Sequence, residues 1–82
     1  MSTPDSSRDL RDCLFYILHR IHGENQASMS VAFGIDQSTI SRGWRRIEAK
    51  ISATDPPLNY LVEAHSRLPP DKLRYLLKAL TE

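Results

Sequence analysis

Cysteine and long apolar runs are nearly absent from this sequence. The single cysteine, Cys13, can form neither an internal disulfide nor a multi-cysteine zinc site, and we interpret it as a small hydrophobic residue. No hydrophobic run approaches the roughly 20 residues that a bilayer-spanning helix needs. Residues 1–5 carry neither the basic start nor the apolar stretch of a signal peptide. We therefore expect a reduced, cytoplasmic protein that has no membrane partner.

The sequence also lacks the usual motifs of catalysis and metal binding. It has no glycine-rich phosphate loop, no paired-histidine metal motif and no nucleophile elbow. His19 and His22 are three residues apart, but no third ligand lies near them in the sequence. A short helical chain also offers little room for a substrate cleft. We expect no enzyme activity, no metal site and no cofactor.

Length and composition are those of one small globular domain. The chain has 82 residues, of which 40% are hydrophobic and 26% are charged. We expect residues 1–5 to form a flexible N-terminus and residues 6–82 to form a single domain. No segment alternates with a period of two, so the sequence predicts an all-α bundle of about five helices.

The first helix is predicted from about Ser7 to His22. A capping-box pattern over residues 6–9 marks its start, and Gly23 is expected to end it. Apolar residues recur at steps of three and one along this segment, which indicates one buried stripe. The stripe consists of Leu10, Cys13, Leu14, Ile17, Leu18 and Ile21.

Two further helices are predicted in the middle of the chain. The first is short, runs from Gln26 to Phe33 and is capped by Asn25. After Gly34, which suits a left-handed turn, Asp36 is expected to cap a helix that begins at Gln37. The apolar stripe of that helix contains Ile40, Trp44, Ile47 and Ile51, with Trp44 expected in the core. Gly43 interrupts the stripe and either admits another backbone or marks a bend.

Two proline-led helices are predicted after a loop at residues 52–55. The first starts at Pro56 and Pro57 and carries apolar residues as far as Leu68. The second runs from about Asp71 to Leu80. Its four leucines either form a dimer interface or close the core of the monomer, and the sequence alone leaves both open. These leucines are Leu73, Leu76, Leu77 and Leu80.

The stretch from Gln26 to Arg42 is the most informative about function. A short helix, a glycine turn and a second helix with a polar first turn follow one another, and apolar residues can form a seam between the two helices. The seam residues are Met29, Phe33, Ile35 and Ile40. This pattern resembles the helix-turn-helix of DNA-binding regulators. The order of all five helices resembles the lambda-repressor-like fold of Cro/repressor-type regulators, and the segment Gly34–Trp44 is similar to short phage transcription activators.

The resemblance departs from the family pattern at two positions. The family usually has alanine four residues before the turn glycine, where this chain has Ser30. Serine is small enough for the close helix contact at that point. The family also has an apolar residue three positions after Ile40, where this chain has Gly43.

The resemblance implies sequence-specific binding to double-stranded DNA, in a bacterial cell or a phage-infected host, by a transcriptional repressor or activator. The family acts as a dimer or higher oligomer, and RNA polymerase is a possible protein partner. The second helix would enter the major groove, where short polar side chains and an arginine read base edges or contact phosphate. The candidate DNA-binding residues are Gln26, Ser28, Gln37, Ser38, Thr39, Ser41, Arg42, Arg45, Arg46 and Lys50.

The distribution of charge supports this interpretation only weakly. The whole chain carries a formal charge of +1. Residues 1–25 have three arginines against four acidic residues, a sum of −1, whereas residues 36–51 have four basic against two acidic residues, a sum of +2. A local basic patch is what phosphate contacts require.

Near-neutral charge keeps a second hypothesis open. The helix-turn-helix could serve as a scaffold that binds another protein, as an inhibitor or adaptor, with exposed aromatic residues such as Tyr60 and Tyr75 as anchors. A DNA-packaging or recombination accessory protein is a third possibility.

Overall fold

All regular structure in the computed structural model, which describes residues 5–53 and 56–81, is helical. Helix α1 (Asp5–Tyr16) continues into one π-helical turn, η1 (Ile17–Ile21). The remaining helices are α2 (Gln26–Phe33), α3 (Gln37–Ser52), α4 (Pro56–Ser66) and α5 (Pro70–Thr81). The predicted all-α bundle of about five helices is confirmed over these residues.

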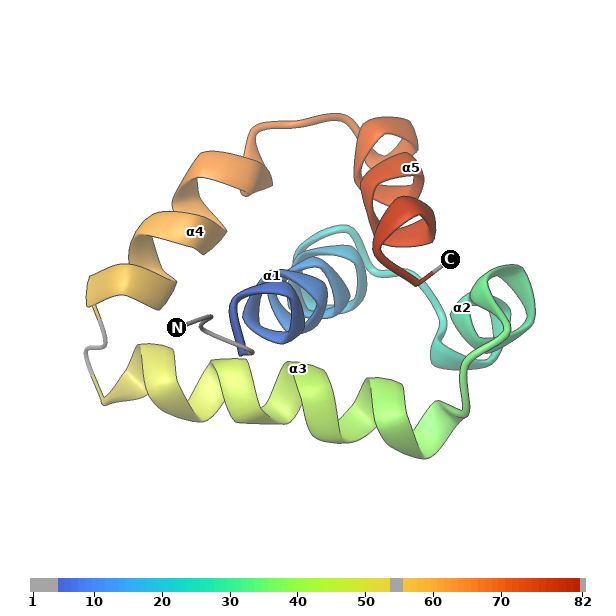
Figure 1. The fold of residues 1–82 in the computed structure, drawn as a ribbon, viewed down its shortest axis with the longest axis horizontal. Coiled ribbons are helices and arrows are strands. Elements are labelled where there is room, and N and C mark those ends of the chain that lie inside the picture. The colour runs from blue at the N-terminus through green and yellow to red at the C-terminus, as the bar shows by residue number, and fades with distance from the viewer. Residues whose placement is uncertain (1–4, 54–55, 82) are drawn as a thin grey trace.

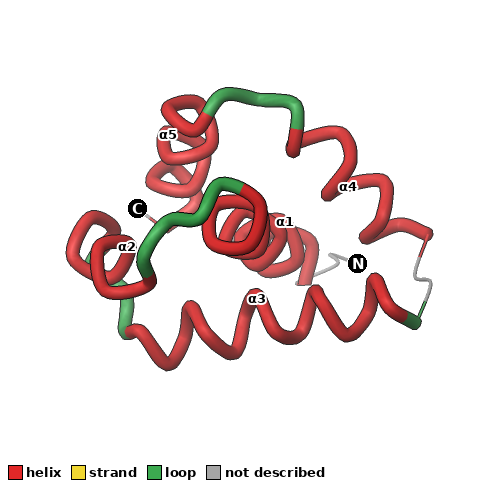
Figure 2. The backbone as a smooth tube through the Cα atoms, turned by 180° about the vertical axis from the view of Figure 1, so that it is seen from behind, coloured by secondary structure: helices red, strands yellow, loops and turns green. Residues whose placement is uncertain are grey.

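Helix α1 is the centre of the bundle. Figure 1 shows it end-on, with α3 beneath it, α4 on one side and α2 and α5 on the other. Figure 2 shows the same arrangement from behind. Because helices surround α1, the side chains of Leu14, Phe15, Ile17 and Leu18 are fully buried, and burial of apolar surface is the main stabilising term in such a fold. The remaining buried hydrophobic residues are Cys13, Met29, Ile40, Trp44, Ile47, Leu58, Leu73 and Leu77.

The two ends of the first helix differ from the prediction. It begins at Asp5 rather than Ser7, and the serine side chains of the predicted capping box, like residues 1–4 of the predicted flexible N-terminus, lie outside the part that the structure describes. Its last turn widens into η1, and the N–H of His22 donates to the carbonyl of Ile17 at 3.0 Å. A wider turn rotates the side chains that follow it. Ile21 is therefore 49% exposed, and its predicted place in the buried stripe is wrong.

Helices α2 and α3 are joined by the glycine turn expected from the sequence. The Asn25 side chain caps α2 by accepting hydrogen bonds from the N–H groups of Ala27 (2.7 Å) and Ser28 (3.3 Å). Gly34 has φ +65°, a left-handed conformation that costs glycine little. Asp36 occupies the N-cap position of α3, but its side chain makes no capping hydrogen bond, so that part of the prediction is wrong.

Gly43 lies on the face of α3 that packs against α1. Helix α3 runs without a break from residue 37 to residue 52, so it is continuous through Gly43. A Cβ atom at Gly43 would lie 2.6 Å from Asp12 Oδ1 and 2.8 Å from Phe15 Cδ2. The missing side chain therefore makes room for α1.

The leucines of α5 close the core of the single chain. Leu73 and Leu77 are fully buried, and Leu76 and Leu80 pack against the same cluster. Of the two roles that the sequence left open, the structure supports the intramolecular one. Helix α4 ends at Ser66, before the predicted Leu68, which packs against the core from the following turn.

We predict that Gly43→Ala destabilises the protein although alanine favours a helix. Overpacking costs about 1–3 kcal/mol. Helix propensity returns at most about 1 kcal/mol. Urea unfolding should show a net loss, because Asp12 and Phe15 are both buried and cannot yield freely. Ala49→Gly, at an exposed position of the same helix, measures the propensity difference alone. A Gly43→Ala protein more stable than the wild type would contradict the close approach of the two helices.

Candidate nucleic-acid interface

The outward side of α3 carries half of the residues predicted to contact DNA. Ser38, Arg42, Arg45 and Ala49 are exposed at i, i+4, i+7 and i+11, which places them on one helical stripe. Gln37 is also exposed, in the first turn of the helix. The buried stripe, formed by Ile40, Gly43, Trp44 and Ile47, holds the opposite face against α1 and α2.

Trp44 fixes α2 against the middle of α3. Its indole Nε1–H donates to Gln26 Oε1 at 3.1 Å, and its ring lies 4.9 Å from the His19 ring at the end of the first helix. Trp44 is 8% exposed, so the expectation that it belongs to the core is confirmed. Gln26 is a predicted phosphate contact, but its side-chain carbonyl already accepts this internal hydrogen bond.

Arg46 is tied to α1 by a network of ion pairs. Its Nε donates to Asp12 Oδ2 at 3.0 Å, and its Nη2 donates to Asp12 Oδ2 at 2.9 Å and to Asp9 Oδ1 at 2.8 Å. Burial alone would lower the pKa of the Arg46 guanidinium, but the hydrogen bonds to the two carboxylates outweigh this and raise its pKa above the ordinary value. Arg46 therefore joins α1 to α3, and no pattern in the sequence indicates this pairing.

Asp12 is the buried centre of this network. It is 1% exposed, and Arg11 also donates to its Oδ1, from Nε at 3.1 Å and Nη2 at 3.0 Å. A buried carboxylate requires partners of this kind, because an unpaired charge in the interior is very costly. The neighbouring Cys13 is fully buried, and burial together with the charges of Asp9 and Asp12 raises the pKa of its thiol to about 12. The thiol is therefore protonated near neutral pH.

The basic residues that remain at the surface of α3 differ in their surroundings. Arg42 is exposed, and among the side chains that the structure describes none forms an ion pair with it. Arg45 is exposed with its guanidinium 5.4 Å from the centre of the Trp44 ring, a cation–π distance. Lys50 is exposed in the last turn of the helix, far along α3 from its polar first turn.

The remaining predicted residues are uncharged. Thr39 and Ser41 are half-buried on α3. Ser28 is exposed in the first turn of α2, where its backbone N–H already donates to the Asn25 side chain. Ser28 thus lies near the start of α2, as expected, but part of its donor capacity is used within the protein.

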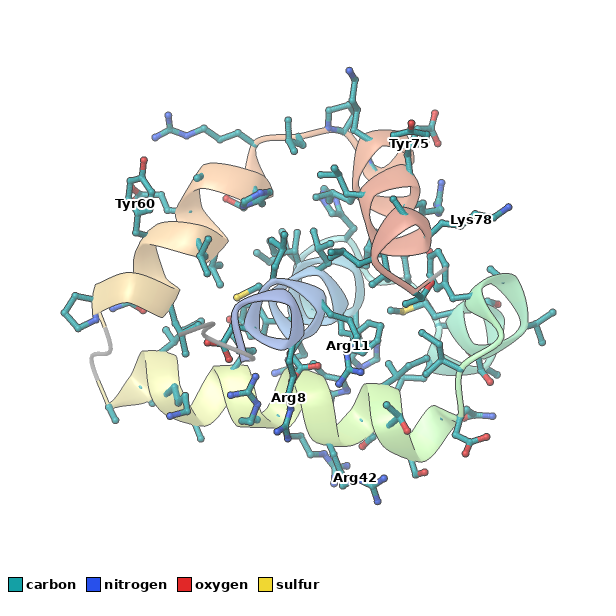
Figure 3. The ribbon with its side chains drawn as sticks, viewed as in Figure 1. Arg8, Arg11, Arg42, Tyr60, Tyr75 and Lys78 are labelled. Atoms are coloured by element: carbon teal, nitrogen blue, oxygen red, sulfur yellow. The ribbon has the colours of Figure 1, made fainter. Side chains whose placement is uncertain are left out.

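Two arginines of α1 lie beside this surface and were not among the predicted site residues. Figure 3 shows Arg8 and Arg11 on the side of α1 that faces α3, with Arg42 projecting outward from α3. Sequence reasoning passed over both arginines because the charges of residues 1–25 sum to −1. The spacing of three residues, which places them on one face of a helix, is the signal that could have identified them.

Comparisons of this chain with protein-family models, with curated proteins and with solved structures found no match. Among the helices that the structure describes, none has the length and apolar character to cross a membrane. Function must therefore be inferred from the residues and their arrangement.

We predict that Arg46→Ala and Arg45→Ala have different effects on stability. Loss of the charged hydrogen bonds at Arg46 should lower the free energy of unfolding by about 2–3 kcal/mol. Loss of the exposed Arg45 cation–π contact should cost no more than about 1 kcal/mol. Thermal or urea unfolding of the two variants, which remove the same side chain from adjacent positions, measures this difference directly. Equal stabilities would show that the network around Asp12 is not what holds α1 to α3.

Proposed function

We propose that the protein is a sequence-specific, double-stranded DNA-binding transcriptional regulator, of the phage type that its sequence resembles, and that α3 enters the major groove. The observation that supports this most directly is the arrangement of α3. Its inward face is buried against α1 and α2, while Gln37, Ser38 and Arg42 are exposed together near its N-terminal end. A helix presented in this way after a glycine turn fits the docking of a recognition helix.

The chemistry of the exposed side chains suits base recognition. A glutamine such as Gln37 can make a bidentate pair with adenine N6 and N7, and a serine such as Ser38 can donate to or accept from either kind of base edge. Arg42, one turn further along, can bond guanine or a phosphate. The rigid packing of Trp44 behind these residues would hold them in register along the groove.

The proposal includes a dimer on DNA. A single small module buries limited surface, and paired half-sites about one helical turn apart supply the affinity of most such regulators. The leucines of α5 belong to the core of the single chain, so the contact between the two copies would have to use another surface.

The protein-binding alternative is favoured by exposed aromatic residues, since Tyr60 and Tyr75 are 72% and 73% exposed. These two tyrosines lie on different helices, α4 and α5, and are far apart in Figure 3. They do not form one aromatic patch of the kind that anchors a protein interface. We therefore place DNA binding first.

The proposal predicts that the double change Gln37→Ala with Ser38→Ala impairs discrimination between sequences. A bidentate base contact contributes about 1–3 kcal/mol of specificity. Binding to a duplex selected from a random-sequence pool should weaken by roughly 5- to 150-fold on this basis. Binding to random duplex should change little, because neither side chain is charged. Fluorescence anisotropy with the two labelled duplexes measures both affinities.

Ser52→Ala, an exposed serine at the far end of α3, is the matched control and should bind both duplexes as the wild type does. Equal weakening of both duplexes by the double change would remove base recognition from the first turn of α3. A wild-type protein that binds no duplex even at low salt, where phosphate attraction is strongest, would overturn the proposed function.

A further inference from the structure

An open cleft of about 500 Å³ lies between α1 and α3 and reaches Thr39 in the first turn of α3. Residues from both helices line it. They are Arg8, Arg11, Asp12, Thr39, Arg42, Gly43 and Arg46. Because Gly43 has no side chain, Asp12 and Phe15 of α1 can lie close to α3 beside the cleft.

The lining of the cleft has a strong excess of positive charge. Four arginines face one aspartate, a net charge of +3, or +2 when Asp9, the second partner of Arg46, is counted with them. Asp12 is neutralised from within, because Arg11 and Arg46 both donate to it. The excess therefore resides at Arg8 and Arg42, for which the described residues provide no ion-pair partner.

The cleft is already organised before any ligand arrives. The guanidinium of Arg11 is held by Asp12 and lies 5.5 Å from the centre of the Phe15 ring, so its orientation is fixed from two sides. Arginine side chains held in this way keep donors free for an outer partner, because a guanidinium has five N–H groups. Thr39 adds a hydroxyl at the end of the cleft nearest the start of α3.

A phosphate group is the ligand that this chemistry fits best. Planar guanidinium groups pair with phosphate oxygens in a bidentate manner, and several arginines converging on one site favour a group with more than one charged or polar oxygen. The N-terminus of α3, the other usual place for phosphate, carries the exposed carboxylate of Asp36 and is less suitable. The cleft is larger than one phosphate group and open to solvent, which suits a phosphate carried on a polymer.

We propose that the cleft between α1 and α3 is a phosphate-binding site in which Arg8 and Arg42 are the principal ligands and Arg11 is a pre-oriented third donor. When the protein is on DNA, the phosphate is one of the backbone, and the site then adds a sequence-independent contact from α1 to the contacts of α3. This DNA-bound form of the site rests on the proposed function. Recognition of phosphate by the cleft does not depend on the proposed function, because binding of free phosphate can be tested separately.

The first measurement is the salt dependence of DNA binding for the wild type and Arg8→Ala. Each lost phosphate contact lowers the slope of log affinity against log salt by about 0.9. We expect Arg8→Ala to lower the slope by this amount and to weaken selected and random duplexes by the same factor. Arg67→Ala is the matched control, because Arg67 is an exposed arginine between α4 and α5, on the opposite side of the bundle from α3 in Figure 1. Its slope should equal that of the wild type.

The second measurement is a titration of the protein alone with sodium phosphate, followed by the arginine Nε–Hε signals in NMR spectra. Sodium chloride at the same ionic strength corrects for general salt effects. Phosphate-specific shifts of the Arg8 and Arg42 signals, lost in Arg8→Ala and retained in Arg67→Ala, support the site. Circular dichroism confirms that both variants are folded, as expected for exposed side chains.

The outcomes separate the two proposals. A reduced slope in Arg8→Ala supports the site with DNA as the source of phosphate. An unchanged slope together with phosphate-specific shifts supports the site with a free phosphate compound as its ligand, and the same shifts in a protein that binds no DNA would sustain the site while the proposed function fails. An unchanged slope and no phosphate-specific shifts, in a protein that does bind DNA, would overturn the site and leave the proposed function standing.

Discussion

The contact between α1 and α3 at Gly43 is the constraint on which the rest of this structure depends. Any side chain at that position would collide with Asp12 and Phe15, so only glycine allows the central helix to lie this close to α3. The closeness buries the Asp12 carboxylate, which then needs charged partners, and Arg46 supplies them across the two helices. The missing side chain at Gly43 and the buried acid therefore act together with the apolar stripe of α3 in holding its inward face against α1.

The same contact determines which charges remain at the surface. Arg46 forms ion pairs with both Asp9 and Asp12, so its charge is balanced within the protein and its role is to stabilise the fold. Arg8 and Arg42 line the cleft from α1 and α3, and no described side chain forms an ion pair with either of them. A chain with a formal charge of only +1 thus presents a locally basic surface, because the two carboxylates nearest the cleft, Asp9 and Asp12, are paired with Arg46. Net charge is therefore a poor guide to whether such a domain can contact phosphate.

Local rules predicted the helices of this fold well and predicted its ion pairs poorly. The bounds of α2, the turn at Gly34 and the start of α3 follow from capping and glycine chemistry within a few residues of each position. The sequence does not distinguish Arg46 from an exposed basic residue of the helix, because its carboxylate partners lie 34 and 37 residues away in the sequence. The prediction that Ile21 is buried is wrong for a different reason. Ile21 lies in the π-helical turn, and the spacing of the apolar residues does not reveal that turn. The exposed residues of α3 could be predicted from the helical period. The contribution of Arg8 and Arg11 could not, because it depends on how α1 packs against α3.

In the proposed complex, Arg42 has a special position, because it belongs both to the exposed stripe of α3 and to the lining of the cleft. Base recognition needs the first turn of α3 to sit at one depth and one register in the groove, and phosphate contacts are what normally set both. A cleft built on the contact between α1 and α3 would set them with little freedom, since α1 cannot slide along α3 without breaking the hydrogen bonds between Arg46 and Asp12. The buried acid that stabilises the bundle would in this way also define where the recognition residues stand on DNA.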